Sequence, residues 1–371
     1  MSKNSKKKKW KLGVIGFAHM HVNGLIDDFN GLAEVEWIAC ADTKPSVKPV
    51  SDQRETRTAN IKRALEVTKI PKYYECYNEM LNSEKFDIII ACPENAKHGE
   101  TAEKIAEKGV HMLFEKPMSS SYGDALRMTR AAAHHNVKLA INWPSTWWAA
   151  VRTAQALAES GIIGRPLKFF YRNSSSLGPL EYGQTLTPYE KSAEWWHREE
   201  DGGGAMLDYC CYGSCLSRWF MGKPAVAAMG IRANLNSTYG DADDNGIITA
   251  RFPDGIATIE GSWTTVHTGI NNGPVVFGEK GTLVCEGGKV LVFKDRNSAE
   301  PTETYNAEPI DEHRNNPAKE FLNHLSAGEP LHITMQPEFN LEAMAILDAG
   351  IRSAKSGRLE LTQSPHFGQK I

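Results

Sequence analysis

The residues best suited to chemistry are the tripeptide Glu115-Lys116-Pro117, which closes a mostly apolar run from Val110 to Phe114. Ligands in open α/β sheets bind outside the carboxyl ends of the strands, where this lysine would lie. Pro117 stops the strand and fixes the loop. We therefore predict a dinucleotide-binding fold with Lys116 at its reaction centre.

A second motif, the sequence GVIGFAHMH over residues 13–21, stands about a hundred residues earlier. Gly16, Ala18 and His21 occupy the three positions that are glycine in the G-x-G-x-x-G fingerprint, so the match is partial. Gly16 can make the sharp turn, and Ala18 is small enough for a pyrophosphate to approach backbone N–H groups at a helix start. The residues predicted to contact the cofactor here are Gly16, Phe17, Ala18 and His19.

Two further segments follow strand-like runs and would border the same ligand. Asp42, at the end of the second predicted strand, can accept hydrogen bonds from both ribose hydroxyls and repel a 2′-phosphate. It favours NAD, although Lys44 nearby leaves NADP open, and an exposed turn aspartate is the alternative. After the predicted strand at residues 86–91 come the other expected cofactor contacts, Pro93, Asn95 and His98.

The glycine-rich segment Asp201 to Tyr212, with the sequence DGGGAMLDYCCY, carries the second group of reactive side chains. We predict a helix from about Ala205 to Phe220, with Gly222 as its stop signal. On that helix Asp208 and Tyr212 are four residues apart, so both would point from one face at one substrate. The alternative for Tyr212 is a packing role.

Together, GVIGFAHMH, Asp42, ACPENAKH, FEKP and GGGAMLDYCCYG resemble the Gfo/Idh/MocA oxidoreductase family, named after glucose-fructose oxidoreductase and inositol dehydrogenase. The resemblance covers nearly the whole chain, and the order and spacing of the motifs make it specific. It implies a Rossmann domain followed by an α/β domain. The mostly antiparallel sheet of that second domain would cover the site on one face and often mediates oligomerisation on the other. The resemblance also implies hydride transfer between a nicotinamide ring and a carbon that bears a hydroxyl.

The resemblance also implies roles for individual residues. Lys116 matches the lysine that hydrogen-bonds the reacting oxygen, with Glu115 beside the cofactor to orient it. A lysine next to a cationic nicotinamide should have a lowered pKa and shuttle protons; an exposed lysine is the alternative. Asp208 and Tyr212 match an aspartate followed four residues later by histidine or tyrosine, of which histidine is the usual acid/base. Tyrosine, with an ordinary pKa of about 10, would need help from Lys116 or from the cofactor charge.

Six of the nine tryptophans fall between residues 143 and 219, the stretch expected to build the substrate wall. Sugar rings bury their C–H faces against aromatic rings, although core packing explains any single tryptophan equally well. The predicted substrate-binding residues are Trp143, Arg172, Trp196, His197, Asp208 and Tyr212.

These residues require a framework of two domains. Over the first 145 residues short β-branched runs alternate with amphipathic stretches, which is typical of parallel strands joined by helices. Later strands follow one another directly, and 253–255 and 287–288 read as hairpin turns of an antiparallel sheet. We predict an α/β protein with a disordered basic tail (1–9), a Rossmann dinucleotide-binding domain (10–145) and a substrate-binding α/β domain (146–371) whose terminal helix packs back.

Composition agrees with an enzyme rather than a nucleic-acid or membrane protein. The formal net charge of −3 gives no attraction to a polyanion, and no apolar stretch reaches the roughly 18 residues of a membrane span. Five lysines in the first nine residues indicate a solvated tail rather than a signal peptide. Seven cysteines without a CxxC pair indicate reduced thiols and a cytoplasmic protein, with Cys210, Cys211 and Cys215 as packing residues.

Two candidate metal sites are rejected. Asp241, Asp243 and Asn245 open like a calcium loop, but Phe252 stands at its twelfth position, and a strand follows where a helix is required. His19 and His21 lie in the dinucleotide turn and lack a third ligand nearby. We predict no metal.

We interpret the chain as an NAD(P)-dependent dehydrogenase or reductase acting on a sugar, a polyol or a sugar derivative. Lys116 and Tyr212 would handle the proton and Asp208 would position the substrate, in a cytoplasmic homo-oligomer, a dimer or tetramer. One alternative is a glycoside hydrolase that oxidises its sugar transiently and consumes no net NAD. Another is a non-catalytic sensor of a nucleotide or sugar, against which the presence of both Lys116 and Asp208 argues.

Overall fold

The structure, a computed structural model, describes residues 9–174, 178, 186–267 and 269–362. Most of the predicted basic tail, residues 1–8, lies outside this part of the chain. Among the described residues, none of the helices has both the length and the apolar character that crossing a membrane requires.

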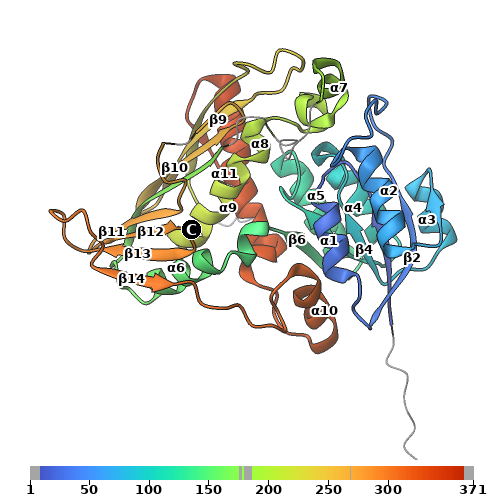
Figure 1. The fold of residues 1–371 in the computed structure, drawn as a ribbon, viewed down its shortest axis with the longest axis horizontal. Coiled ribbons are helices and arrows are strands. Elements are labelled where there is room, and N and C mark those ends of the chain that lie inside the picture. The colour runs from blue at the N-terminus through green and yellow to red at the C-terminus, as the bar shows by residue number, and fades with distance from the viewer. Residues whose placement is uncertain (1–8, 175–177, 179–185, 268, 363–371) are drawn as a thin grey trace, which may run out of the picture.

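The N-terminal part of the chain forms a six-stranded parallel sheet, as predicted for a Rossmann domain (Figure 1). The strands lie in the order β3-β2-β1-β4-β5-β6, so the direction of winding reverses between β1 and β4. Such a reversal opens a crevice at the carboxyl ends of the strands, where ligands bind. The strands are β1 (Trp10–Ile15), β2 (Val35–Ala41), β3 (Tyr73–Tyr74), β4 (Ile88–Ala91), β5 (His111–Glu115) and β6 (Leu139–Asn142).

The helices between these strands bury their apolar faces against the sheet and against one another. Helix α5 begins where the Ser121 hydroxyl accepts a hydrogen bond from the backbone N–H of Asp124, an N-cap. Helices α1 and α2 contact each other, as do α4 and α5. The helices are α1 (Val22–Phe29), α2 (Arg57–Thr68), α3 (Tyr77–Ser83), α4 (His98–Ala106) and α5 (Tyr122–His134).

The later part of the chain forms a nine-stranded sheet in the order β14-β13-β12-β11-β7-β10-β9-β8-β15. All its pairs are antiparallel except β7 with β10. Both predicted hairpins are present, joining β9 to β10 and β12 to β13. The strands are β7 (Pro166–Ser174), β8 (Ala227–Ala233), β9 (Asn245–Phe252), β10 (Gly255–Ser262), β11 (Val275–Gly278), β12 (Thr282–Glu286), β13 (Lys289–Phe293), β14 (Glu303–Asn306) and β15 (Glu360–Leu361).

Helices cover one face of this sheet and connect it to the Rossmann domain (Figure 1). Helix α9 packs on β7 and β10, α6 on β12 and β13, and α11 on β8 and β9; α11 also contacts α5 and β6. The C-terminal helix thus packs back onto the first domain. The helices are α6 (Ala149–Glu159), α7 (Pro188–Ala193), α8 (Ala205–Asp208), α9 (Cys210–Met221), α10 (Pro317–Ala327) and α11 (Pro337–Ser356).

The predicted single helix from Ala205 to Phe220 is wrong in one respect, because it is broken at Tyr209 into α8 and α9. At the break, the carbonyl oxygen of Asp208 accepts a hydrogen bond from the Cys211 thiol (2.8 Å), a partner outside the regular helix pattern. Gly222, with φ of 69°, ends α9 as predicted. Asp208 therefore closes one helix, while Tyr212 lies in the first turn of the next.

Candidate active site

The crevice is lined by the residues that follow β1, β2, β4 and β5. Gly16 has φ of +86°, and a Cβ atom there would lie 2.4 Å from the backbone nitrogen of Pro93. Only glycine fits both the positive φ and this close approach. The turn after β1 is thereby pressed against the loop after β4.

Asp42 is held in a buried cluster of charges. Its Oδ1 accepts hydrogen bonds from the backbone N–H groups of Phe17 (3.0 Å) and Thr43 (2.9 Å). Arg57 Nη1 lies 2.7 Å from both carboxylate oxygens of Asp42, and Arg57 Nη2 pairs with Glu94. Burial raises the pKa of Asp42, while the Arg57 guanidinium opposes the rise. Sequence reasoning missed Arg57 and Glu94, which lie 15 and 52 positions after Asp42.

Lys116 and Asp208 form an ion pair at the end of β5. Lys116 Nζ lies 2.6 Å from Asp208 Oδ1, and the two side chains are only 2% and 5% exposed. Burial lowers the pKa of Lys116, but the nearby Asp208, Cys211 and Glu115 groups together outweigh it, so the net direction is upward. The expected lowering of this pKa concerns a lysine beside a bound cationic nicotinamide, and it stays a prediction. Lys116 is an ammonium group that donates hydrogen bonds.

Tyr212 presents its ring, not its hydroxyl, to Lys116. Lys116 Nζ lies 4.8 Å from the centroid of the Tyr212 ring, a cation–π contact. Trp148 stacks on the same ring, with the ring centroids 6.1 Å apart and the ring planes inclined by 4°. Trp143 meets the Tyr212 ring edge-on, with the centroids 5.8 Å apart. Burial raises the pKa of Tyr212 well above its ordinary value. Lys116 was expected to help lower the pKa of the Tyr212 hydroxyl, but Lys116 contacts the ring of Tyr212 instead.

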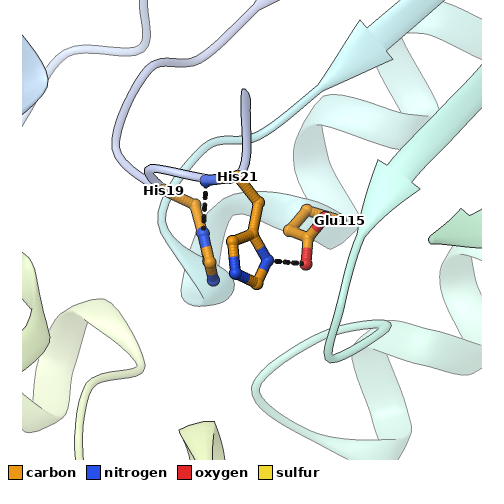
Figure 2. A group of neighbouring side chains, drawn as sticks. All are labelled: His19, His21 and Glu115. Atoms are coloured by element: carbon orange, nitrogen blue, oxygen red, sulfur yellow. Dashed lines mark hydrogen bonds and ion pairs between the residues drawn. The ribbon is translucent and has the colours of Figure 1, made fainter. Parts of the chain in front are cut away.

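Glu115 faces a different partner from Lys116, because consecutive residues of a strand point to opposite sides. Its Oε1 lies 2.7 Å from His21 Nδ1 (Figure 2). Its Oε2 accepts a hydrogen bond from Asn142 Nδ2 (2.8 Å). Glu115 is fully buried. The expectation that Glu115 orients Lys116 is therefore corrected: Glu115 orients His21.

His19 lies beside His21, with ring centroids 4.2 Å apart (Figure 2). His19 Nδ1 accepts a hydrogen bond from the backbone N–H of His21 (3.1 Å), which assigns the His19 proton to Nε2. That Nε2 is buried and has no hydrogen-bond partner among the described residues. Burial, followed by the charges of His21 and Lys116, lowers the pKa of His19 well below its ordinary value. His19 is therefore a neutral ring with a free N–H donor.

Candidate ligand atoms of His19, His21 and Glu115 lie within 4.8 Å of one another. The expectation that the two histidines lack a third nearby side chain is therefore wrong, since Glu115 comes close only through folding. A metal, however, needs a lone pair from each ring. The observed hydrogen bonds engage the Nδ1 lone pair of His19 and place its proton on Nε2, so His19 has no free lone pair for a metal, whereas His21 keeps one on Nε2.

The segment that precedes α8 lies over the turn after β1. Trp195 Nε1 donates to the carbonyl oxygen of Ala18 (2.8 Å), and the ring of Trp196 meets His19 edge-on at 4.6 Å. Asn95 Nδ2 donates to the carbonyl oxygen of Gly202 (2.9 Å). These contacts bring the predicted cofactor residues and the predicted substrate residue Trp196 together at one crevice.

Three other predicted residues are more peripheral. His98 is buried, with Nδ1 3.0 Å from the carbonyl oxygen of Met118. Trp143 is buried and donates from Nε1 to Asn340 Oδ1 (2.7 Å), so it backs Tyr212 rather than facing a groove. His197 meets the rings of Tyr239 and Trp263 edge-on, and burial lowers its pKa to about 3.

Arg172 does not reach this site, and its prediction as a substrate-binding residue is wrong. Tyr171, the preceding residue on β7, is buried and feels the charge of Lys116. Because neighbouring side chains of a strand point to opposite faces, Arg172 projects from the other side of the sheet. There it forms an ion pair of 2.6 Å with Glu260.

A groove of about 680 Å³ opens beside the reaction centre and is bordered by α1 and the segment after β6. Its inner end is formed by His21 and Asn142, which hold Glu115, and by Trp148, which stacks on Tyr212. Trp148 is 41% exposed, unlike the buried tryptophans around it. The volume suits a small-molecule ligand. Sequence reasoning noted the tryptophan cluster but did not select Trp148 or Asn142.

The residues of the crevice fit a dinucleotide. The turn at Gly16 brings backbone close to the start of α1, whose N-terminus favours an anion. Buried polar atoms without a described partner surround this turn: His19 Nε2, Asn95 Oδ1, His98 Nε2 and Trp196 Nε1. Buried polar groups are normally hydrogen-bonded, so these atoms indicate a polar ligand.

Comparison with known proteins agrees with this fold and site. Residues 11–143 match a sequence model described as an oxidoreductase family with an NAD-binding Rossmann fold, and residues 151–284 match a GFO/IDH/MocA C-terminal domain. A 2,7-anhydro-N-acetylneuraminate hydratase of Mediterraneibacter gnavus is 26% identical over 58% of this chain and 56% of its own length. A D-xylose 1-dehydrogenase [NADP(+)] of Haloarcula marismortui is 28% identical over 55% of each chain. The match thus spans little more than half the length of these relatives.

Among solved structures, a WlbA dehydrogenase of Bordetella pertussis in complex with NADH and UDP-GlcNAcA has the same fold. It superposes with a TM-score of 0.75 at 19% identity, over 96% of this chain and 99% of that chain. The likeness extends over both sheets rather than over the Rossmann domain alone.

Proposed function

Because the chain belongs to the Gfo/Idh/MocA oxidoreductase family, we propose that it is an NAD(P)-dependent oxidoreductase of a sugar, polyol or sugar derivative. The reaction would transfer a hydride between the nicotinamide and a hydroxyl-bearing carbon. The observation that carries this proposal is the buried Lys116–Asp208 ion pair at the end of β5. Lys116 contacts the ring of Tyr212, on which Trp148 of the groove stacks.

The cofactor would lie along the carboxyl ends of β1, β2 and β4. Gly16, Phe17, Ala18 and His19 would border the pyrophosphate, while Pro93, Asn95 and His98 would border the nicotinamide half. When bound, the nicotinamide supplies the acceptor or donor of the hydride. Asp42 would face the adenosine ribose, and its pairing with Arg57 leaves that arginine no free edge for a 2′-phosphate. NAD is therefore the proposed coenzyme.

The substrate would enter by the groove and reach Lys116. As an ammonium group, Lys116 donates a hydrogen bond to the reacting oxygen and stabilises negative charge that develops there. Asp208 fixes the position of Lys116 and competes with substrate for its protons. Trp148 would pack against the C–H face of the substrate, and Tyr212, which supports both Trp148 and Lys116, is a platform in this proposal.

A second candidate is a lyase or hydrolase that oxidises its substrate only transiently. The relative from Mediterraneibacter gnavus is named as a hydratase, a reaction in which no reduced nicotinamide accumulates. The same crevice would serve such chemistry. The two candidates differ in whether reduced cofactor builds up in proportion to product.

We also propose that the protein is a cytoplasmic homo-oligomer with domains at 10–145 and 146–371. All seven cysteines are unpaired in the structure, which suits a reducing compartment. The face of the nine-stranded sheet opposite α9 exposes apolar side chains that a second copy would cover. They include Met229, Ile231, Ile247, Ile256 and Phe277.

The test is to incubate the protein with NAD or NADP and a panel of sugars, polyols and their anhydro derivatives. Absorbance of reduced nicotinamide and NMR spectra of the products are followed together. Equal amounts of reduced cofactor and oxidised product support the dehydrogenase. Product without reduced cofactor supports the transient oxidation, and cofactor binding without any product contradicts both.

A further inference from the structure

The reaction centre holds a proton donor but needs a proton acceptor for oxidation. Lys116, paired with Asp208, is protonated and has no lone pair to offer. Tyr212 keeps its phenolic proton, because burial raises its pKa well above the ordinary value. An alcohol that loses a hydride must also lose its hydroxyl proton, so another group has to take it.

His21 is held in the geometry of such a base. Its Nδ1 lies 2.7 Å from Glu115 Oε1, and because a carboxylate only accepts hydrogen bonds, this nitrogen carries the proton. Nε2 therefore carries the lone pair. Asn142 holds the other oxygen of Glu115 at 2.8 Å, so the carboxylate that orients the ring is itself fixed. Carboxylate–histidine pairs of this form activate bases on many unrelated folds.

His21 also has the access that a proton acceptor needs. Its side chain is 31% exposed and lines the groove, whereas Glu115 is fully buried. Beside it, His19 offers a buried N–H donor at Nε2. One nitrogen that donates and one that accepts can bind the same hydroxyl group, which is both acceptor and donor.

We propose that His21 is the general base of the reaction in the direction of oxidation, and the general acid in the direction of reduction, with Glu115 as its positioning residue. This inference rests on the proposed oxidoreductase function. His19 would donate to the same substrate oxygen or to a water molecule that bridges it to His21.

The step balances in atoms and charge. When bound, oxidised nicotinamide would supply the acceptor for the hydride of the substrate C–H bond, and the proton of the O–H bond would pass to His21 Nε2. The substrate carbon and oxygen that lose these hydrogens would become a carbonyl group. The resulting imidazolium is stabilised by the Glu115 carboxylate and releases its proton to solvent through the groove.

The charges around His21 come from several elements. The strand β5 brings the Glu115 carboxylate and is followed by the Lys116 ammonium group. The turn brings neutral His19. The groove adds Asp28 from α1 and, from the segment before α2, Arg54 and Glu55. Glu115 is the charged group in direct contact with His21, and the neutral His19 ring packs beside it.

The first test compares His21→Gln and Glu115→Gln with His135→Gln, a change of the exposed histidine at the C-terminal cap of α5. With a substrate from the panel, His21→Gln should lower kcat by about 100-fold or more, without changing the affinity for NAD. In His21→Gln, the acidic limb of the pH profile of kcat/KM should disappear. In a second variant, His21→Gly, added imidazole should restore part of kcat. His135→Gln should match the wild type. An unchanged acidic limb in His21→Gln would overturn the proposal.

Two further measurements keep the inference separate from the proposed function. Long-range ¹H–¹⁵N spectra of the holoenzyme report where each imidazole proton lies, whether or not a substrate is found. Protons on Nδ1 of His21 and on Nε2 of His19 are expected, and the opposite arrangement at His21 would overturn the proposal. Loss of activity with a chelator, restored by Zn²⁺, would instead make these residues a metal site.

Discussion

The ammonium group of Lys116 and the carboxylate of Asp208 lie 2.6 Å apart, and this ion pair joins the end of β5 to the end of α8. The pair links the Rossmann sheet to the helices of the second sheet, so the reaction centre exists only when both parts have folded together. It also helps to set the charge of the lysine, because the Asp208 carboxylate, together with Cys211 and Glu115, outweighs burial in the effect on the pKa of Lys116.

Removal of one member of this pair should cost stability as well as activity. Asp208→Asn leaves a buried ammonium without its counter-charge, and we expect a loss of about 3–5 kcal/mol in the free energy of unfolding. Urea denaturation measures this loss. The matched control is Glu303→Gln, which breaks the exposed Lys294–Glu303 pair and should cost no more than about 1 kcal/mol. Equal small losses would mean that the buried pair is not intact in solution.

Tyr212→Phe should retain most of the activity. The ring that supports Lys116 and stacks with Trp148 is preserved, and only the hydroxyl is removed. We expect kcat to fall by less than about 10-fold, compared with at least 100-fold for a group that transfers the proton. Tyr212→Leu, which removes the ring, is the control and should fall further. A loss in Tyr212→Phe as large as in Tyr212→Leu would return the proton transfer to the phenol.

Coenzyme preference should depend on the pairing of Arg57. Asp42→Ala removes a carboxylate that holds Arg57 and would repel a 2′-phosphate. We expect the ratio of kcat/KM for NADP to that for NAD to rise by about 10-fold or more, which corresponds to about 1.4 kcal/mol. Asp311→Ala, at an exposed position, serves as the control. An unchanged ratio would show that Asp42 does not face the adenosine ribose.

Stability should fall in acid partly because of His197. Its folded pKa of about 3 is depressed from 6.5, chiefly by burial, so the folded state disfavours the protonated form. Above pH 6.5 the neutral His197 makes its full contribution to the free energy of unfolding. This contribution is lost as the pH falls toward 3, at about 1.4 kcal/mol for each pH unit. His197→Phe keeps the aromatic contacts with Tyr239 and Trp263 and should flatten this dependence. Denaturation curves between pH 4 and 7 test it; parallel curves for variant and wild type would contradict the burial of a neutral ring.

Much of the fold follows from local patterns in the sequence. The predicted second strand, which ends at Asp42, is present as β2 (Val35–Ala41), and the turns at 253–255 and 287–288 join strands as their turn residues indicate. Two strands of two residues, β3 and β15, carry too little periodicity to be recognised. Their existence depends on the neighbouring strands β2 and β8, which supply the hydrogen bonds.

The candidate site was harder to predict, because its contacts join distant parts of the chain. Motifs identified Lys116, Asp208 and Asp42, but not that Arg57 would occupy the Asp42 carboxylate. Arg172 was misassigned by a single residue of strand register, since Tyr171 beside it faces the site. The ion-pair partner of Asp42 and the face of β7 that a residue occupies depend on packing between elements, which the spacing of residues in the sequence does not reveal.

The most direct test follows the absorbance of reduced nicotinamide while the wild type and Lys116→Ala meet the sugar and polyol panel with NAD. Coenzyme affinity is measured in parallel, so that loss of binding is not mistaken for loss of chemistry. We expect the wild type to turn over and Lys116→Ala to bind NAD with kcat reduced by at least about 100-fold. Turnover of Lys116→Ala at the wild-type rate would contradict the assignment of Lys116 to the reaction centre.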